Sequence, residues 1–190
     1  MVQVVSIARN FLLLVSVLCL TGSCGRNSGP DSGSNQKLTL PRKPNVLLVV
    51  VDTLRADHLG FYGYSDHPTS PFLDSLESES IIVNGLTGVS SWTMPSMATL
   101  FSGLTPAEHR VMRMSGPGSE FQVPDKIAAT FRKQGYATAC IMSNFLLLKG
   151  RGFNEGFDLY DDHLARGLDP HRGSTAAEVA SAGIDWLQSR

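Results

Sequence analysis

The sequence has little cysteine, almost no net charge and no long apolar run. Its 190 residues include three cysteines, too few for a disulfide framework. The 16 Lys and Arg nearly balance the 17 Asp and Glu, and this balance excludes a dedicated nucleic-acid binder, which would carry a basic excess. The apolar run at residues 11–20 is about half as long as the roughly 20 residues that a helix needs to span a bilayer.

The amino terminus is typical of an export signal. The run at 11–20 follows Arg9, and small residues lead to Cys24. This resembles the end of a bacterial lipoprotein signal, which implies a lipid on Cys24 and a membrane-anchored protein in the periplasm or at the cell surface. Plain secretion and an uncleaved anchor are the alternatives. We therefore assign residues 1–24 to the signal and the Gly- and Ser-rich residues 25–44 to a flexible linker.

Residues 45–190 have the composition and pattern of an α/β domain. Apolar residues make up 42% of the chain and charged residues 17%, enough to build a core. The Val-rich run 45–51 predicts a strand covered on both faces, because it lacks period-two alternation. Short apolar segments predict further strands at 81–83 and 136–142. Helices are predicted to start at Ser70-Pro71, with an apolar stripe that begins at Phe72, and to cover 95–101, with Gly103 as the stop. Further helices are predicted at 125–134 and at 175–190, where apolar residues recur with a period of 3.6. Capping-box spacing between Thr175 and Glu178 marks the last helix. The alternation of elements predicts an α/β fold with a mainly parallel sheet.

Asp52 follows the first predicted strand directly. Ligands of open α/β sheets bind beyond the carboxyl ends of the strands, and a carboxylate there suits a divalent cation. The alternative is a structural role as the cap of a helix that starts at Thr53.

Thr93 lies at the start of the predicted helix that contains Pro95. The amino end of a helix offers N–H groups and partial positive charge, which stabilise an anionic ester oxygen. A Thr hydroxyl there could also bind a metal and lose its proton. The alternative is an ordinary N-cap.

Three stretches together resemble the sulfatase family of the alkaline phosphatase superfamily. They read PNVLLVVVDTLRADHLGFYGY, TSPFLDSLESES and WTMPSMATLFSGLTPAEHRV, and the resemblance continues through KIAATFRKQGYATACIMSN and GFNEGFDLY. It implies an alkaline-phosphatase-like sandwich and a hydrolase of sulfuric or phosphoric esters. It also implies a divalent cation (Ca, Mg, Mn or Zn) held by Asp52 and Thr93, with Thr93 as the nucleophile.

The chain departs from the family pattern at several positions. The family has an acidic pair after the first strand, where this chain has Asp52 and Thr53. The family's Cys or Ser, which matures to formylglycine, is Thr93 here, and the Arg of its motif is Met97. Because Thr cannot give the formylglycine aldehyde, we expect no formylglycine and a direct attack by the Thr hydroxyl. The family's Lys-x-His segment is replaced by residues 141–144.

A nucleophilic Thr is also found in envelope phosphoglycerol and phosphoethanolamine transferases, so such a transferase is the first alternative. A non-catalytic fragment is the second, because the family's domain is longer than residues 45–190 and its other metal ligands come from a later strand. We expect this chain to be the amino-terminal part of a larger enzyme and to have negligible turnover alone.

The remaining polar residues have weaker functional signals. We expect structural roles for the set Arg55, Asp57, His58, Trp92 and His109. Cys140, in an apolar strand, is expected to be a buried inert thiol. Ser143 and Asn144 follow a strand and either pack or touch substrate, whereas His163 and His171 lie in a polar loop without metal-ligand spacing.

Overall fold

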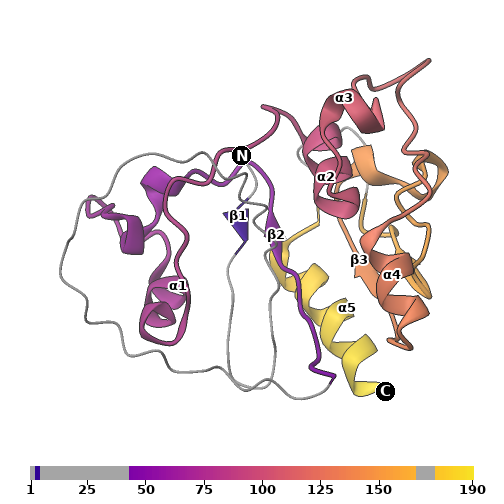
Figure 1. Ribbon diagram of the computed structural model, residues 1–190. Helices are drawn as coiled ribbons and strands as arrows, with labels where there is room; N and C mark the ends of the chain where they lie inside the picture. The colour runs from indigo at the N-terminus through magenta and orange to yellow at the C-terminus, as the bar shows by residue number, and fades with distance from the viewer. Residues whose placement is uncertain (1–2, 5–42, 166–173) are drawn as a thin grey trace, which may run out of the picture. The chain divides into compact units, whose positions relative to one another are not determined.

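The structure is a computed structural model that describes residues 3–4, 43–165 and 174–190 (Figure 1). The chain folds as two compact units, Val2–Leu86 and Thr87–Arg190, and each is described by itself. Almost all of the predicted signal and linker, including Cys24, lies outside the described residues. Within the described ranges, no helix combines the length and apolar content that crossing a bilayer requires.

The unit up to Leu86 contains a two-stranded antiparallel sheet. Its strands are β1 (Gln3–Val4) and β2 (Val50–Val51), with Val4 opposite Val50. The predicted strand 45–51 is therefore too long, and the prediction that both of its faces are covered is wrong, since Leu47, Val49 and Val51 are exposed. The physical reason is the lack of neighbours: among the described residues, β1 is the one strand that pairs with β2.

Short helices form the rest of this unit. They are η1 (Ala56–His58), η2 (Gly60–Tyr62), α1 (Pro71–Ser75) and η3 (Glu77–Glu79). The predicted helix after Ser70 is confirmed, although its apolar stripe is not, because Phe72 is exposed. The predicted strand 81–83 is wrong: these residues have no strand partner within the described ranges, and Ile81 is exposed.

The start of η2 is held by side chains from the start of α1. The Gly60 N–H donates to Ser70 Oγ at 2.9 Å, and the Phe61 N–H donates to Asp74 Oδ1 at 3.0 Å. The Ser70 hydroxyl in turn donates to Asp74 Oδ1 at 2.9 Å. These bonds satisfy two N–H groups that a short helix leaves without partners, and they join two segments that have few buried apolar side chains.

The unit from Thr87 onward contains the larger core and most of the regular structure. Its helices are α2 (Thr93–Ser102), α3 (Pro106–His109), α4 (Ile127–Lys133) and α5 (Ala176–Gln188), with short turns η4 (Phe145–Leu147) and η5 (Lys149–Arg151). Strands β3 (Ala139–Ile141) and β4 (Leu159–Asp161) pair in parallel, with Cys140 opposite Tyr160. The parallel pair confirms the predicted strand within 136–142 and agrees with an α/β fold.

Helix ends in this unit follow the predicted local signals. Gly103 ends α2 in the left-handed conformation with φ 72°, and Thr175 forms the predicted capping box with Glu178.

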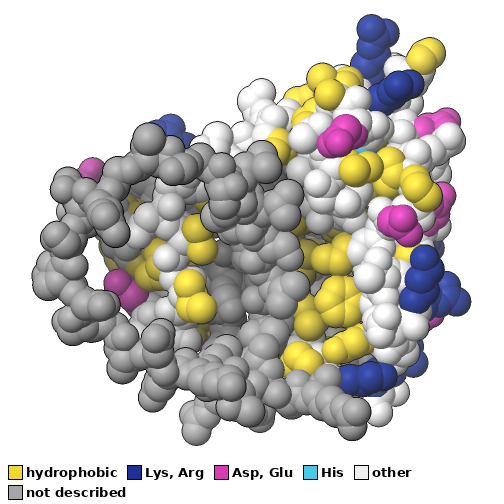
Figure 2. Space-filling model, in the orientation of Figure 1, with side chains coloured by type: hydrophobic (Ala, Val, Ile, Leu, Met, Phe, Trp, Pro, Cys, Tyr) yellow, Lys and Arg dark blue, Asp and Glu magenta, His cyan; other side chains and the backbone are white. Residues whose placement is uncertain are grey.

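The predicted apolar face of α5, however, has no buried residue, and Ile184 is 52% exposed. The described residues cover this face only in part, and hydrophobic side chains reach the surface at several places on the side of the molecule shown in Figure 2.

Aromatic rings and methionines form the core of the same unit. Phe121 and Phe153 are fully buried, with ring centroids 5.0 Å apart, and Phe101 meets the Phe153 ring edge-on at 6.2 Å. Met94 and Met97 of α2 are buried as well. Four of α2's first five residues are therefore anchored in the core, and the position of its amino end is set by packing.

Candidate functional site

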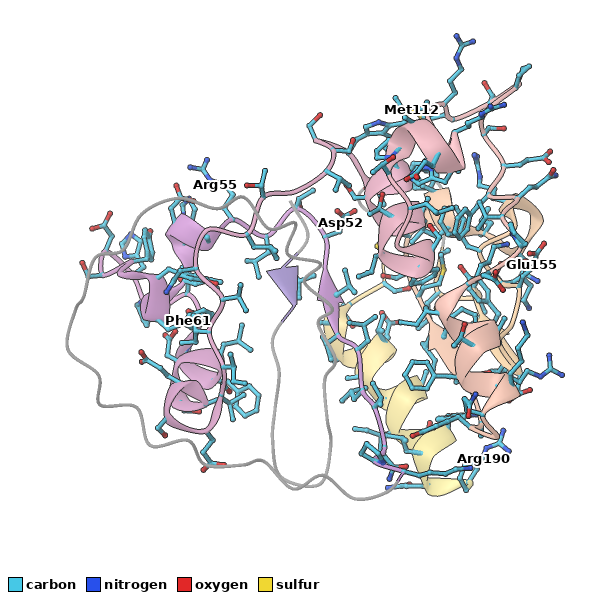
Figure 3. All side chains as sticks on the ribbon, viewed as in Figure 1. Asp52, Arg55, Phe61, Met112, Glu155 and Arg190 are labelled. Atoms are coloured by element: carbon cyan, nitrogen blue, oxygen red, sulfur yellow. The ribbon has the colours of Figure 1, made fainter. Side chains whose placement is uncertain are left out.

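Asp52 lies directly after β2, half-buried, in a turn (Figure 3). The alternative reading, in which its carboxylate caps a helix starting at Thr53, is wrong. The first helical turn after it is η1, whose N-cap position is Arg55. Asp52 is therefore a strand-end carboxylate, as the sequence predicted for a cation ligand.

The residue after Asp52 has an unusual backbone. Thr53 has φ 61°, in the left-handed region that a β-branched residue rarely adopts. Conformations of this kind cost of order 1–3 kcal/mol and persist only where the surrounding structure holds them. The strained residue is the one that stands in the second place of the family's acidic pair, so the chain keeps a demanding turn beside Asp52 although the second carboxylate is missing.

Thr93 is the first residue of α2, and the cap position belongs to Trp92. The side chain of Thr93 is half-buried at the amino end of a helix of ten residues. The first N–H groups of a helix have no partners within it, and the helix dipole places partial positive charge at this end. A negatively charged oxygen on Thr93, or on an ester bound beside it, is stabilised by this environment.

Two neighbours of Thr93 on α2 have structural roles. The buried Ser96 hydroxyl is shared between the carbonyl oxygens of Trp92 at 2.9 Å and Ser90 at 3.3 Å, which ties the helix to the preceding turn. Met97, at the position of the family's Arg, is buried in the core one helical turn after Thr93. This side chain packs and offers no partner to an anion.

The described residues do not build a complete metal site. No group of three or more His, Cys, Asp or Glu side chains suited to a metal ion occurs in residues 3–4, 43–165 and 174–190. Asp52 and Thr93 supply one carboxylate and one hydroxyl, fewer donors than the four or more that divalent cations take. They belong to different compact units, so their predicted convergence on one ion stays a prediction.

The residues after Asp52 have structural partners, as predicted. The Arg55 guanidinium donates to both carboxylate oxygens of Asp57, with the Nε contact at 2.9 Å, and the pair is exposed. The hydrogen bond and charge of Arg55 hold the pKa of Asp57 below its usual value. The ring of His58 lies 5.0 Å from the ring of Tyr64. These contacts brace the loop and leave no sign of a catalytic role.

His109 is a buried packing residue, as predicted. The Val111 N–H donates to its Nδ1 at 3.0 Å, so Nδ1 is an acceptor and the proton of the neutral ring is on Nε2. Nε2 lies 3.1 Å from Thr99 Oγ1, to which it donates. Burial lowers the pKa of His109 below its ordinary value, because the charged form would lose its hydration. Both ring nitrogens are therefore occupied by structural bonds.

The end of β4 holds a pair that the sequence analysis missed. Asp161 Oδ1 accepts hydrogen bonds from the His163 ring at Nδ1 and from the His163 backbone N–H at 3.1 Å. The available signal was the Asp-x-His spacing of residues 161–163, but the sequence patterns predicted no strand before it. Ser143 and Asn144 follow the paired strand β3: Ser143 is exposed, whereas Asn144 Oδ1 accepts from the Leu146 N–H and caps η4. His171 lies outside the described residues.

Comparisons with known proteins identify the family. The model of the family described as Sulfatase matches residues 44–171. The arylsulfatase of Clostridium perfringens (strain 13 / Type A) is 35% identical over 154 residues, which cover 78% of this chain and 31% of the relative. No solved structure shows a significant match.

The chain belongs to the sulfatase family, within the alkaline phosphatase superfamily. Family membership implies an α/β fold of the alkaline phosphatase type, and the helices and parallel β3–β4 pair agree with it. Sulfatases are ester hydrolases that generally use a divalent metal ion. The chain spans about a third of the length of the relative that it matches.

Proposed function

We propose that this chain carries the nucleophile of a metal-dependent hydrolase of sulfuric or phosphoric esters, and that Thr93 is this nucleophile. The observation that supports the proposal best is the place of Thr93 at the amino end of α2, where the following residues are fixed in the core. Aryl sulfates are the first substrates to test, because the relative from Clostridium perfringens is an arylsulfatase.

We propose a direct displacement rather than chemistry at an aldehyde. The deprotonated Thr93 oxygen bonds to the sulfur or phosphorus of the ester, and the bond from that atom to the leaving oxygen breaks. A covalent Thr ester results, which water hydrolyses in a second step. The amino end of α2 stabilises the negative charge on the transferred group.

We propose that Asp52 and Thr93 are donors to the divalent cation of the family. A carboxylate oxygen suits any of Ca, Mg, Mn and Zn, so the donor type does not select among them. When bound, the cation would lower the pKa of a hydroxyl or water that it touches. The described residues contain no group of three or more His, Cys, Asp or Glu side chains that would complete the site.

Substitution of Thr93 tests the nucleophile. In protein expressed from its complete coding region, we expect Thr93→Ala to abolish hydrolysis of p-nitrophenyl sulfate and of a phosphate diester, and Thr93→Ser to keep part of it. Thr130→Ala is the matched control, because the Thr130 hydroxyl only donates to the Lys126 carbonyl, within α4's first turn. Mass spectrometry of rapidly quenched wild type should find the sulfuryl or phosphoryl group on Thr93. Activity retained by Thr93→Ala would contradict the assignment.

The envelope transferase is the second candidate, and the Thr at the nucleophile position favours it. A transferase passes the phosphorylated alcohol from the Thr ester to an acceptor alcohol in preference to water. Adding glycerol as acceptor should then raise release of the first leaving group and yield a glycerol phosphodiester. A hydrolase yields free sulfate or phosphate at an unchanged rate, and a non-catalytic fragment yields neither product.

We also propose export and attachment to a membrane through a lipid on Cys24. The support is sequence alone: the short apolar run, the small residues and the Gly- and Ser-rich segment that follows. Cleavage before Cys24 would also remove β1, leaving β2 without that partner. Labelling with radioactive palmitate in a bacterial host should modify the wild type and leave Cys24→Ser unlabelled, and labelling of both would contradict the proposal.

A further inference from the structure

The parallel strands β3 and β4 bring two loops to one sheet edge. Ile141 and Asp161 are opposite each other at the carboxyl ends of these strands, and the Met142 N–H donates to the Asp161 carbonyl at 3.0 Å. The chain then continues into Ser143 on one side and His163 on the other. This is the edge at which open α/β sheets bind ligands.

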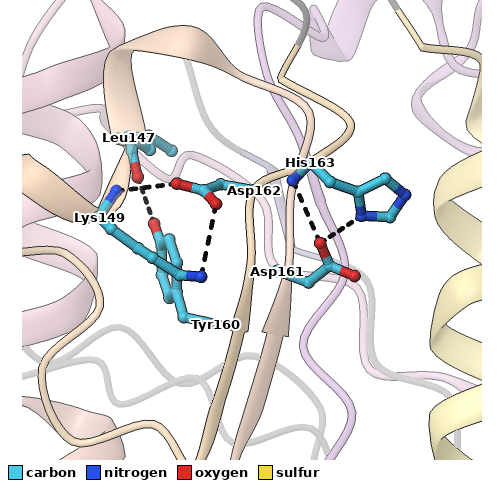
Figure 4. A network of polar contacts seen from close by, with 6 residues as sticks. All are labelled: Leu147, Lys149, Tyr160, Asp161, Asp162 and His163. Atoms are coloured by element: carbon cyan, nitrogen blue, oxygen red, sulfur yellow. Dashed lines mark hydrogen bonds and ion pairs between the residues drawn. The ribbon is translucent and has the colours of Figure 1, made fainter.

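At this edge, the imidazole of His163 is held in one orientation and one tautomer (Figure 4). Its Nδ1 donates to Asp161 Oδ1, so in the neutral ring Nε2 carries the lone pair, and this atom points away from Asp161. The side chain of His163 is 62% exposed, whereas that of Asp161 is 25% exposed. Burial raises the pKa of Asp161, but the hydrogen bonds from His163 outweigh it and keep this carboxylate ionised.

The neighbouring acid has a different partner. Asp162 Oδ2 accepts from the Lys149 N–H at 3.1 Å, and Asp162 Oδ1 lies 3.7 Å from Lys149 Nζ (Figure 4). The two acids therefore have different partners, although they are adjacent in the chain. Asp162 fixes the start of η5, and Asp161 fixes the ring of His163.

Four other polar groups of this unit are poorly suited to proton transfer. Both ring nitrogens of His109 are occupied, and the buried Lys126 donates three bonds. Burial raises the pKa of Cys140 to about 12, and it also raises the pKa of Tyr160 above its ordinary value. The side chain of His163, in contrast, is exposed, and its Nε2 points away from Asp161.

We propose that His163 is the proton donor to the leaving oxygen and that Asp161 is its positioning residue. The inference rests on the proposed ester hydrolysis. The cycle starts with His163 as the imidazolium, which carries a proton on both ring nitrogens. When the bond between sulfur or phosphorus and the leaving oxygen breaks, its electron pair goes to that oxygen, which takes the proton from Nε2 and leaves the ring neutral. In the second step, the neutral ring accepts a proton from water while the water oxygen bonds to sulfur or phosphorus. The Thr93 oxygen then leaves with its electron pair, and both His163 and Thr93 return to their starting states.

The test compares two leaving groups in the ester class that the wild type hydrolyses. The p-nitrophenyl ester has an acidic leaving phenol that departs without a proton, whereas the phenyl ester needs one. We expect His163→Gln to leave kcat/KM for the p-nitrophenyl ester within about twofold and to reduce that for the phenyl ester by about 10²- to 10⁴-fold, the usual contribution of general acid catalysis. Asp161→Asn should show the same selectivity with a smaller loss.

Controls separate a catalytic effect from a structural one. His67→Gln replaces an exposed histidine in the other unit and should change neither substrate. Asp162→Asn removes the contacts to Lys149 and should affect both substrates equally, if at all. Nitrogen NMR should find the neutral ring of His163 protonated at Nδ1 in the wild type and mixed between the two nitrogens in Asp161→Asn.

Each outcome decides something. Equal losses for both esters in His163→Gln, no loss for either, or a wild-type ring protonated at Nε2 would each overturn the role of His163 while the hydrolase proposal stands. A wild type that hydrolyses neither sulfate nor phosphate esters would overturn the proposed function and this inference with it.

Discussion

The ammonium group of Lys126 donates a hydrogen bond to the carbonyl oxygen of Gly152, 2.8 Å away and 26 positions later in the chain. It also donates to the Phe121 carbonyl at 2.9 Å and to the carboxylate of Glu155, and it lies 4.6 Å from the centre of the Phe121 ring. Lys126 is only 3% exposed. One buried cation therefore joins the segment before α4 to the loop that precedes β4.

Replacing this cation should destabilise the unit from Thr87 onward. Lys126→Met keeps most of the apolar stem but leaves the Phe121 and Gly152 carbonyls without their donor. Each buried group left unpaired should lower the free energy of unfolding by about 1–3 kcal/mol. Urea unfolding followed by tryptophan fluorescence reports this unit, because both tryptophans of the chain, Trp92 and Trp186, lie in it. Lys133→Met, which removes an exposed contact of 3.6 Å to Asp125, should cost less than about 1 kcal/mol. An equal loss of unfolding free energy in the two variants would show that the buried hydrogen bonds of Lys126 do not stabilise the protein.

The buried His109 should make stability depend on pH. Its pKa in the folded protein is below that of about 6.5 in the unfolded chain. The unfolded state therefore binds more protons below that pH, and the free energy of unfolding falls as the pH drops from 6.5 toward the folded pKa. Above pH 6.5, both states are neutral at this ring and it contributes no slope.

Urea titrations at pH 7.5 and 5.5 measure this effect. We expect this ring to lower the free energy of unfolding of the wild type between these values by at most about 1.4 kcal/mol, because only the one pH unit between 6.5 and 5.5 contributes. His109→Gln should reduce that loss, whatever its effect at pH 7.5, and the exposed His67 serves as the control, since His67→Gln should keep the wild-type slope. A His109→Gln slope equal to that of the wild type would contradict the prediction.

Replacing Gly156 and Gly183 by alanine should change the free energy of unfolding in opposite directions. Gly156 has φ 91°, and a Cβ built there would lie 2.4 Å from the backbone nitrogen of Ala129 in α4. Gly156→Ala should therefore lower the free energy of unfolding by more than the roughly 1–2 kcal/mol of left-handed strain alone. Gly183, inside α5, has open space around its Cβ position, so Gly183→Ala should stabilise by up to about 1 kcal/mol. Thermal unfolding of both variants decides the signs, and a stable Gly156→Ala protein would show that α4 moves freely.

Sequence reasoning succeeded where the determinants are local. The capping box of Thr175 and Glu178, the stop at Gly103 and the start after Ser70 each depend on residues within one or two turns. Such signals act through the chain's own N–H and carbonyl groups, so they hold without any tertiary partner. The same locality placed Thr93 at the start of α2.

Prediction from the sequence failed where a helix or strand depends on partners that are distant in the chain. The run 45–51 and the residues 81–83 have strand-like composition, but a strand needs a paired neighbour, and the described residues give β2 only β1 and give 81–83 none. The described residues cover the apolar face of α5 only in part, for the same reason. At the candidate site, the pairing of Asp161 with His163 depends on the turn after β4, which residue spacing suggests but does not fix.

Cys140 offers a test of burial at the centre of the β3–β4 pair. Burial and the negative charge of Asp161 raise the pKa of its thiol to about 12, whereas an ordinary thiol has a pKa near 8.5. At pH 8, only about one Cys140 thiol in ten thousand is therefore ionised. In a protein with Cys19→Ser and Cys24→Ser, Cys140 is the single cysteine. We expect it to react with Ellman's reagent slowly in the native state and rapidly in 6 M guanidinium chloride, as the thiolate is the reacting form.

The matched control for Cys140 is Ser143→Cys in a background with Cys140→Ser. Residue 143 is exposed two positions after β3 ends, so its thiol should react at the rate of a free peptide. Asp161→Asn removes the charge opposite the strand end and should speed the reaction of Cys140 only slightly, since desolvation is the larger cause of the raised pKa. A native Cys140 that reacts as fast as the thiol at 143 would mean that the β3–β4 pair opens readily in solution, and the orientation of His163 beside it would then lack a rigid support.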